Sequence, residues 1–410
     1  MTGNGRNFTP RMLTFPALAA LSASCLAVLT AGPASASASP PVINASLSAV
    51  SCPPVNNCMA VGWFFGQIPG TSGAQNFTLA ERWNGRTWTV LPSPSPRHPG
   101  GGELLSSVSC TSSTNCVAVG QIQVEVPPGV TILHPLAESW NGTKWRLVPT
   151  PKLPHAGATL NGVACTNASN CMAVGNVGTP QNDTMLTLAE RWNGTAWTVV
   201  RTPRTPGGTA LNTVSCTSPA ACMAVGFDSF NNATGGSLTL AEQWNGAAWQ
   251  RRATPTPGSR GGLAGVACTS PAACLAVGGH ATPAVNLATL AEQWNGTGWQ
   301  VQASRNPRGA AVAGLGGISC PGAAACMAVG SSTDPTGETA FNLAETWNGT
   351  SWSLVKTPNP GSTENELRGV SCIGPSSCMA VGDFAGLGNQ LTLAESWNGS
   401  RWSVVKTPRP

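Results

Sequence analysis

The 410-residue chain contains no tyrosine, and histidine and aspartate are both scarce. The four histidines fall in unrelated loops, and the aspartates occur singly rather than in the spacing of a calcium loop. These residues therefore predict neither a metal site nor a catalytic triad, and we expect no cofactor. They are His98, His134, His155, His280, Asp183, Asp228, Asp334 and Asp383.

Charge is also scarce, since Asp, Glu, Lys and Arg make up 9% of the chain and the net charge is only +5. A nucleic-acid-binding surface needs a clustered basic face, which this weak and dispersed charge does not provide. The 48 glycines and 34 prolines are typical of disordered chains. However, hydrophobic residues reach 41%, and tryptophan and cysteine recur at a fixed period, which a disordered chain has no reason to keep.

The N-terminal segment has the pattern of an export signal. Arg6 and Arg11 precede an apolar run over 12–32, and two Ala-x-Ala sites follow within 34–38. We expect residues 1–38 to be cleaved; an uncleaved anchor and a lipid-modified Cys25 are the alternatives. No later apolar run is long enough to span a bilayer. The mature chain, 39–410, is expected to be a secreted monomer.

A repeat of roughly 50 residues organises the mature chain. Each copy begins with a Cys-x5-Cys pair inside a Leu-x-x-Val-Ser/Ala-Cys, five residues, Cys-Met-Ala-Val-Gly pattern. Fourteen of the 15 cysteines are therefore fixed to the repeat. The pairs are Cys52 with Cys58, Cys110 with Cys116, Cys165 with Cys171, Cys216 with Cys222, Cys268 with Cys274, Cys320 with Cys326, and Cys372 with Cys378.

Each copy continues with Leu-Ala-Glu-x-Trp-Asn-Gly-x-x-Trp and a Val-rich tail that ends in Thr-Pro or Ser-Pro. The short apolar runs predict strands, and Asn-Gly predicts a hairpin because both residues tolerate positive φ. A two-residue turn and a longer bulged loop both remain open. The tryptophans are Trp83 with Trp88, Trp140 with Trp145, Trp192 with Trp197, Trp244 with Trp249, Trp294 with Trp299, Trp347 with Trp352, and Trp397 with Trp402.

Four antiparallel strands per copy are typical of propeller blades, which bury their faces by stacking around an axis. We predict an all-β fold, a seven-bladed β-propeller of four-stranded antiparallel blades. An open β-solenoid is the alternative, but it would need atypical polar end repeats. The expected blades are 46–96, 104–151, 159–204, 209–257, 262–307, 314–360 and 366–410.

The paired cysteines are expected to form one disulfide within each blade, because they lie at facing ends of a hairpin in an exported chain. Each disulfide closes a short loop and would stabilise the fold by about 2 kcal/mol. Metal binding is the alternative, but the spacing is not a zinc pattern and no histidine is fixed to the repeat.

The connections between strands differ in how constant they are. The loop between the first two strands and the Asn-Gly turn are the same length in every copy, whereas the other connections vary. We therefore expect a binding surface on the variable side, since rigid scaffolds carry function on variable loops. Its candidate residues, which could instead pack beneath long loops, are Trp63, Phe64, Phe65, Phe227, Asp228, Phe230, Asp383 and Phe384.

One glutamate recurs in every copy, which argues for a structural role because a catalytic pair would be singular. These are Glu81, Glu138, Glu190, Glu242, Glu292, Glu345 and Glu395. An enzymatic role would instead have to use loop acids, of which Asp228, Glu338 and Asp383 are the first to consider.

The order of Val-Gly, an acidic strand and a later Trp resembles the kelch repeat of galactose-oxidase-like propellers. Over residues 46–410 the repeat is more similar to Cys- and Trp-rich proteins exported by high-GC bacteria. It departs from the kelch pattern in lacking the paired Gly and the Tyr. The copper-radical oxidases and the sialidases of related propellers both need tyrosines, so neither activity is implied.

The leading functional hypothesis is a secreted, non-catalytic propeller that binds a glycan, a cell-wall polymer or a protein. A hydrolase or lyase that acts on polysaccharide, and a structural envelope protein, are the alternatives. The ligand itself is unknown from the sequence.

Overall fold

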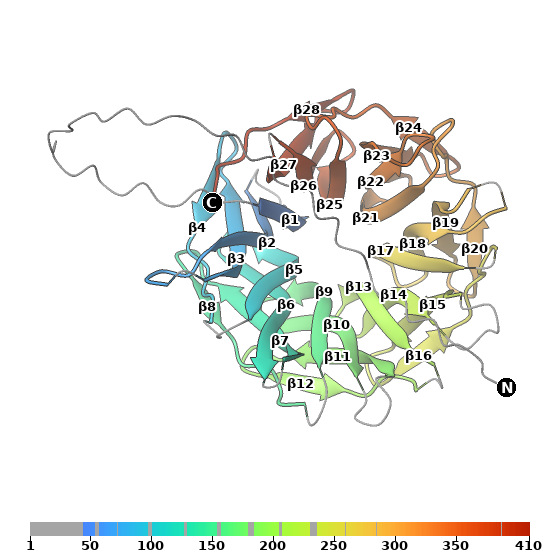
Figure 1. Ribbon diagram of the computed structural model, residues 1–410. Helices are drawn as coiled ribbons and strands as arrows, with labels where there is room; N and C mark the ends of the chain where they lie inside the picture. Colours follow the sequence, from blue (N-terminus) through green and yellow to red (C-terminus); the bar gives the residue numbers. More distant parts are fainter. Residues whose placement is uncertain are drawn as a thin grey trace, which may run out of the picture. The chain divides into compact units, whose positions relative to one another are not determined.

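The computed structural model describes residues 44–53, 57–71, 73–96, 101–126, 129–153, 157–178, 184–204, 207–229, 236–258, 260–283, 285–386 and 388–410. The chain divides into two units, Met1–Ser39 and Pro40–Pro410, and all described residues belong to the second. Their regular secondary structure consists only of strands, which are arranged as a ring of seven blades (Figure 1). The predicted fold class is confirmed.

Each blade takes its four strands from one continuous stretch of chain. The first strands are β1 (Asn44–Ser51), β5 (Gly102–Ser112), β9 (Ala158–Asn167), β13 (Thr209–Ser218), β17 (Gly261–Ser270), β21 (Ala313–Gly322) and β25 (Asn365–Gly374). The second strands are β2 (Cys58–Gln67), β6 (Asn115–Val126), β10 (Asn170–Gly178), β14 (Ala221–Asp228), β18 (Ala273–His280), β22 (Ala325–Thr333) and β26 (Ser377–Ala385).

The outer half of each blade is shorter. The third strands are β3 (Ala74–Trp83), β7 (Val130–Trp140), β11 (Met185–Trp192), β15 (Leu238–Trp244), β19 (Ala288–Trp294), β23 (Ala340–Trp347) and β27 (Gln390–Trp397). The fourth strands are β4 (Trp88–Leu91), β8 (Trp145–Leu147), β12 (Trp197–Val200), β16 (Trp249–Arg252), β20 (Trp299–Gln302), β24 (Trp352–Val355) and β28 (Trp402–Val404).

The hydrophobic core is divided into seven layers, one between each pair of neighbouring blades. Between blades 1 and 2, for example, Met59 and Val61 of β2 pack with Leu105 of β5 and Trp145 of β8. The first strands of neighbouring blades contact one another around the inside of the ring, and β25 meets β1 to complete it (Figure 1). Stacking thus buries both faces of every sheet, as the repeat predicts.

The ring closes between blades 7 and 1 without exchanging a strand. The only ladder pairing there, within the described chain, is the parallel contact of Asn44 with Gln390. The Gln390 backbone N–H also donates to Asn44 Oδ1 at 2.9 Å. The junction therefore depends on side-chain packing and a few hydrogen bonds.

All seven predicted disulfides are present, one in each blade. They join Cys52 with Cys58, Cys110 with Cys116, Cys165 with Cys171, Cys216 with Cys222, Cys268 with Cys274, Cys320 with Cys326, and Cys372 with Cys378.

The two cysteines of each bridge differ in burial. The first is half-buried on or just after the first strand, whereas the second is at most 7% exposed and belongs to a core layer. The cysteines are therefore structural staples of the core rather than parts of a surface site. The buried members are Cys58, Cys116, Cys171, Cys222, Cys274, Cys326 and Cys378.

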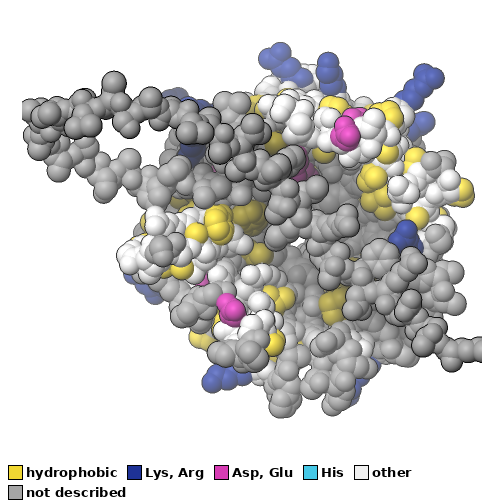
Figure 2. Space-filling model, in the orientation of Figure 1, with side chains coloured by type: hydrophobic (Ala, Val, Ile, Leu, Met, Phe, Trp, Pro, Cys, Tyr) yellow, Lys and Arg dark blue, Asp and Glu magenta, His cyan; other side chains and the backbone are white. Residues whose placement is uncertain are grey.

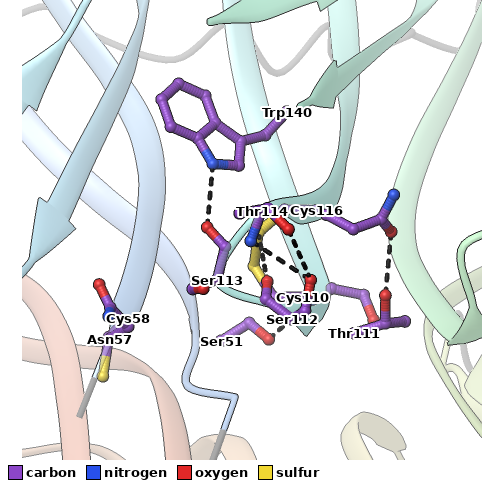
Figure 3. The surroundings of a disulfide bond; sticks show 12 residues. Ser51, Asn57, Cys58, Cys110, Thr111, Ser112, Ser113, Thr114, Cys116 and Trp140 are labelled. Atoms are coloured by element: carbon purple, nitrogen blue, oxygen red, sulfur yellow. Dashed lines mark hydrogen bonds between the residues drawn. A yellow bond between two sulfur atoms is a disulfide. The ribbon is translucent and has the colours of Figure 1, made fainter. Parts of the chain in front are cut away.

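Several of the disulfides lie beside a hydrogen bond that joins two neighbouring blades. Around Cys110–Cys116 (Figure 3), the Cys110 N–H donates to Ser51 Oγ of the preceding blade at 2.9 Å. The same bond joins the Cys165 N–H to Ser109 Oγ at 3.0 Å. The staple within a blade thus lies next to a contact that holds two blades together.

The Trp-Asn-Gly element forms a four-residue loop, which settles the turn geometry that the sequence left open. In blade 2, Trp140 pairs directly with Trp145, and their ring centroids are 5.8 Å apart. Asn141 Oδ1 accepts the backbone N–H groups of Thr143 and Lys144, each at 3.0 Å. Gly142 has φ 93°, a conformation that favours glycine.

The same turn is fastened to the loop that carries the disulfide. Trp140 Nε1 donates to the carbonyl oxygen of Ser113 at 3.2 Å (Figure 3). The two constant connections therefore lie on one side of the ring, which we call the constant face. The remaining connections lie on the other side, the variable face, as antiparallel strands require.

Candidate functional site

The predicted binding residues lie at the variable-face ends of second strands rather than in the loops where the sequence placed them. The strands continue past the repeat glycine because both neighbouring strands keep pairing with them. Phe230 lies outside the described residues. The others are Trp63, Phe64 and Phe65 in β2, Phe227 and Asp228 in β14, and Asp383 and Phe384 in β26.

Only two of these described residues are in contact across the junction of blades 7 and 1: Phe64 packs against the layer that these blades share, and Asp383 is bonded to blade 1. Phe384 packs against the layer between blades 6 and 7 instead. Ser46 pairs with Trp63 in blade 1, and its Oγ donates to Asp383 Oδ1 of blade 7 at 2.6 Å. Phe227 and Asp228 belong to blade 4 instead. The candidates therefore form no single site.

Asp383 is fully buried and holds a neighbouring arginine. Its Oδ1 accepts Arg368 Nε at 2.8 Å, and its Oδ2 accepts Gln390 Nε2 at 2.6 Å. Glu366 contacts the other side of the guanidinium at 2.7 Å. Asp383 has no exposed surface to offer a ligand, so its role is to position Arg368, whose side chain is 37% exposed.

Arg368 is a candidate ligand-binding residue that the sequence analysis did not identify. It is the only cationic residue on the seven first strands, all of which are described. The other copies have Ser, Asn, Ala or Gly after the same leucine, for example Ser48 and Gly316. This single departure from the repeat was the available signal.

Asp228 forms an ion pair with Arg251 at 2.6 Å, and its own side chain is 3% exposed. Arg251 lies on the outer strand β16, where other blades expose an aliphatic side chain such as Val199 or Leu354. The pair joins strands of one blade, which supports a structural role for Asp228.

The aromatic side chains of blade 1 are partly engaged with each other. The Phe64 ring stacks on Phe77 with centroids 5.3 Å apart, and Phe64 packs against the layer shared with blade 7. Both rings line a cavity of about 320 Å³ beside the outer strand β4. Phe384, at the same repeat position in blade 7, lines another cavity of about 320 Å³, which we call the blade 7 cavity.

A larger crevice of about 680 Å³ lies between blades 5 and 6 on the variable face. Loop residues supply nearly all of its walls, and none of the described residues that line it is charged. We call it the 5/6 crevice. It is lined by Thr282, Pro283, Val285, Asn286, Ala288, Asn306, Pro307, Gly309, Ala310, Ala311 and Pro335.

The Leu287 side chain packs over two glycines beside the crevice. A Cβ on Gly279 would come within 2.9 Å of the Leu287 side chain, and one on Gly314 within 3.5 Å. Leu287 therefore folds over both glycines and forms a parallel bridge with Val312. The bridge holds together the two loop segments that form most of the crevice walls.

The seven repeated glutamates are all buried in the interfaces between blades. Several accept a hydrogen bond from the preceding blade. Ser93 Oγ donates to Glu138 at 2.7 Å, and Asn342 Nδ2 donates to Glu395 at 2.9 Å. Burial raises the pKa of each carboxyl to about 7 or about 8.

One of these carboxyls has a second acid nearby. Burial raises the pKa of Glu103, on β5, to about 7, and its charge in turn helps to raise the pKa of Glu138. Gln75 Nε2 is 3.4 Å from Glu103. Both acids are at most 1% exposed, so this carboxyl pair is closed to a substrate.

The described surface offers few other reactive groups. Glu338 is exposed in the loop that Asp334 caps, and its backbone N–H donates to Asp334 Oδ1 at 3.1 Å. No group of three or more His, Cys, Asp or Glu with metal-binding geometry occurs among the described residues. In the face shown in Figure 2, Lys and Arg side chains stand apart near the outer edge.

The described part of the chain contains no helix of the length and hydrophobicity needed to cross a membrane.

Comparisons with known proteins bear on the fold alone. No family model matches the sequence, and no curated protein is significantly similar to it. Among solved structures, YCF48 bound to D1 peptide is similar, with 13% identity, a TM-score of 0.46, and coverage of 83% of this chain and 91% of that one. A protein of unknown function from Dyadobacter fermentans has 13% identity, a TM-score of 0.48, and coverage of 87% and 96%.

The Hadza microbial sialidase Hz136 is also similar in fold, with 8% identity, a TM-score of 0.44, and coverage of 88% of this chain and 66% of the sialidase. Resemblances at this level transfer no ligand and no activity to the chain.

Proposed function

We propose that the protein is an exported, non-catalytic binding propeller that holds an uncharged glycan in the 5/6 crevice. The observation that carries this proposal is a roomy crevice walled by variable-face loops, in which no described lining residue is charged. Small-molecule binding sites commonly have volumes of this order and contain a few polar groups that orient the ligand. Here Asn286 and the Asn306 Nδ2 group supply amides that suit sugar hydroxyls, whereas Asn306 Oδ1 and the Thr282 hydroxyl are bonded within the loops.

The acids of the described chain support binding rather than catalysis. Asp228 and Asp383 are paired with arginines, and the repeated glutamates are buried between blades. A glycosidase needs two carboxyl groups that reach one exposed bond. The hydrolase or lyase alternative has no such observation in its favour.

Export is part of the same proposal. Fourteen cysteines are joined in disulfides, and disulfides persist in oxidising compartments. We propose that residues 1–38 are a cleaved signal and that 39–410 is secreted as a monomer. N-terminal sequencing of the protein from culture medium should start near residue 39, and a cytoplasmic chain that keeps residue 1 would contradict this. The kelch-type origin of the repeat also remains a proposal, supported by Val-Gly in the second strand and Trp at the start of the fourth.

A glycan and polysaccharide array tests the binding site. Asn286 is exposed and lines the crevice, so Asn286→Trp should fill it and abolish binding, and Asn286→Ala should weaken binding about fivefold to tenfold. Ala247→Trp, on an exposed turn of the constant face, is the matched control and should bind normally. An array without hits, or full binding by Asn286→Trp, would overturn the proposal. A protein captured in a pull-down and lost with Asn286→Trp would replace the glycan with a protein ligand.

A further inference from the structure

The blade 7 cavity lies where the chain leaves an outer strand and runs back along the third strand. In four other blades, a side-chain oxygen on this returning segment accepts a backbone N–H of the third strand. Ser95 Oγ accepts from Thr78 N at 3.1 Å, and Asn306 Oδ1 accepts from Thr289 N at 2.8 Å. The bonds from Thr239 to Thr256 (3.2 Å) and from Asn342 to Asn359 (2.7 Å) are the equivalents. The repeat thus normally supplies its own acceptor.

Blade 7 lacks this acceptor. The residue at the Ser95 position is Arg409, whose guanidinium can only donate. Thr407 still anchors the segment by donating from Oγ1 to the Thr392 carbonyl oxygen at 3.0 Å. No described group accepts the Thr392 N–H, which lies at the position of Thr78 N. Blade 2 needs no acceptor because Pro135 has no N–H. Blade 3 also has an arginine, Arg204, at the Ser95 position, so blade 7 is distinguished by the cavity beside its N–H and not by the missing oxygen alone.

The cavity next to this N–H has room for a ligand and a mostly apolar wall. Its volume is about 320 Å³. The apolar lining residues are Ala45, Phe384, Leu391, Leu393, Ala394, Val404, Val405, Pro408 and Pro410. Lys406 and Arg409 also line it, and both are exposed. Neither takes part in an ion pair with another described residue.

The polar groups that await a partner here are therefore donors and cations beside an apolar wall. We propose that the blade 7 cavity binds an apolar molecule that ends in a carboxylate. One carboxylate oxygen accepts the Thr392 N–H, in the place that Ser95 Oγ takes in blade 1, and Arg409 and Lys406 balance the charge. The apolar body lies against Phe384 and Leu391. This site is separate from the 5/6 crevice and does not depend on its glycan.

Calorimetric titration of the full-length mature protein with octanoate tests the proposal. Octanol and octylamine have the same chain without the carboxylate, so each should bind at least about tenfold more weakly than octanoate. Arg409→Ser restores the oxygen that other blades use and removes a cation, so it should lower octanoate affinity by at least about tenfold. Because four blades already have this bond, the variant is expected to fold.

Two controls separate the site from general effects. Arg86→Ser removes an exposed cation from the constant face and should leave octanoate binding unchanged. Asn286→Trp, which blocks the 5/6 crevice, should also leave it unchanged, so this proposal and the glycan proposal can fail separately. Equal binding of octanol and octanoate, or unchanged binding by Arg409→Ser, would overturn the assignment.

The Thr392 amide provides a direct second readout. In a ¹H–¹⁵N spectrum, octanoate should move the Thr392 amide proton downfield, because that proton gains a charge-assisted hydrogen bond. Arg409→Ser should move the same resonance without ligand. An amide that is unmoved by saturating octanoate would contradict the proposed contact.

Discussion

The backbone N–H of Cys52 donates to Ser371 Oγ at 3.0 Å, which joins residues 319 positions apart in the chain. It is the same bond that links neighbouring blades elsewhere, as between Cys268 and Ser215. At this junction, however, no chain segment connects the two blades. The closure of the ring thus repeats an ordinary blade interface without its covalent connection.

Ser371→Ala should increase local opening at this junction more than an equivalent change increases it at an internal junction. The lost bond should cost about 1 kcal/mol of unfolding free energy in either Ser371→Ala or Ser215→Ala. Only Ser371→Ala should also speed amide hydrogen exchange in β1 and β25, because local opening there is not limited by a linker. Equal exchange in the two variants would show that the junction is as firm as the others.

The protein should lose stability as the pH rises from about 4.5 to about 8. The repeated glutamates have folded pKa values of about 7 or about 8, above the ordinary 4.5. The folded state therefore binds more protons than the unfolded state in this range, so rising pH favours unfolding. Urea unfolding should give a free energy at least about 2 kcal/mol lower at pH 8 than at pH 5.

Glu81→Gln provides the control for this pH dependence. Both carboxylate oxygens of Glu81 are buried without a hydrogen-bond partner in the described structure. Glutamine does not titrate, so the variant should show a shallower fall in stability with pH. An unchanged slope in Glu81→Gln, or a rise in stability toward pH 8, would contradict the assignment.

The hydroxyl of Pro135→Thr should add a hydrogen bond across the interface between blades 2 and 3. Thr187, at the same repeat position in blade 3, donates to Glu242 of the next blade at 3.2 Å. Pro135 has no hydroxyl, and both oxygens of Glu190 are buried without a partner in the described structure. A threonine should supply the missing donor, so Pro135→Thr should have an unfolding free energy about 1 kcal/mol higher than that of Pro135→Val, which adds the same backbone N–H without a hydroxyl.

Removal of a single disulfide should weaken the fold without abolishing it. A double variant with Cys165→Ala and Cys171→Ala opens a loop with a sequence separation of 6 and should lower the unfolding free energy by about 2 kcal/mol. Calorimetry of the variant gives the measurement, and the other six bridges should remain intact by mass spectrometry after alkylation. A loss below about 0.5 kcal/mol would show that the staple is redundant.

The repeated features of the fold could be predicted because the same short-range sequence pattern occurs in all seven copies. The Cys pairs, the Asn-Gly loop and the division into blades depend on residues close in sequence. Contacts unique to one blade could not be predicted in this way. Arg368 finds Asp383 on the next strand, and Leu287 forms its bridge with Val312, which precedes the first strand of the following blade.

The candidate site was less predictable than the fold for the same reason. The aromatic residues were placed in loops because Gly62 marks the end of the repeat motif, but β2 continues to Gln67. The 5/6 crevice has no aromatic or charged signature in the sequence. The proposed role of the blade 7 cavity depends on a missing hydrogen-bond acceptor. Arg409 stands where four other blades have a side-chain oxygen, and the need for that oxygen is evident only when the chain has folded back beside Thr392.

Because every blade draws its four strands from one unbroken stretch, a whole copy could be gained or lost by recombination without leaving a half-built sheet. Five of the seven described blades have a serine that accepts the cysteine amide of the next blade, so most new neighbours would keep this bond. The number of blades therefore depends on how many copies the gene carries and on the ring curvature that the blade interfaces tolerate. It does not depend on a single contact between the first and last blades.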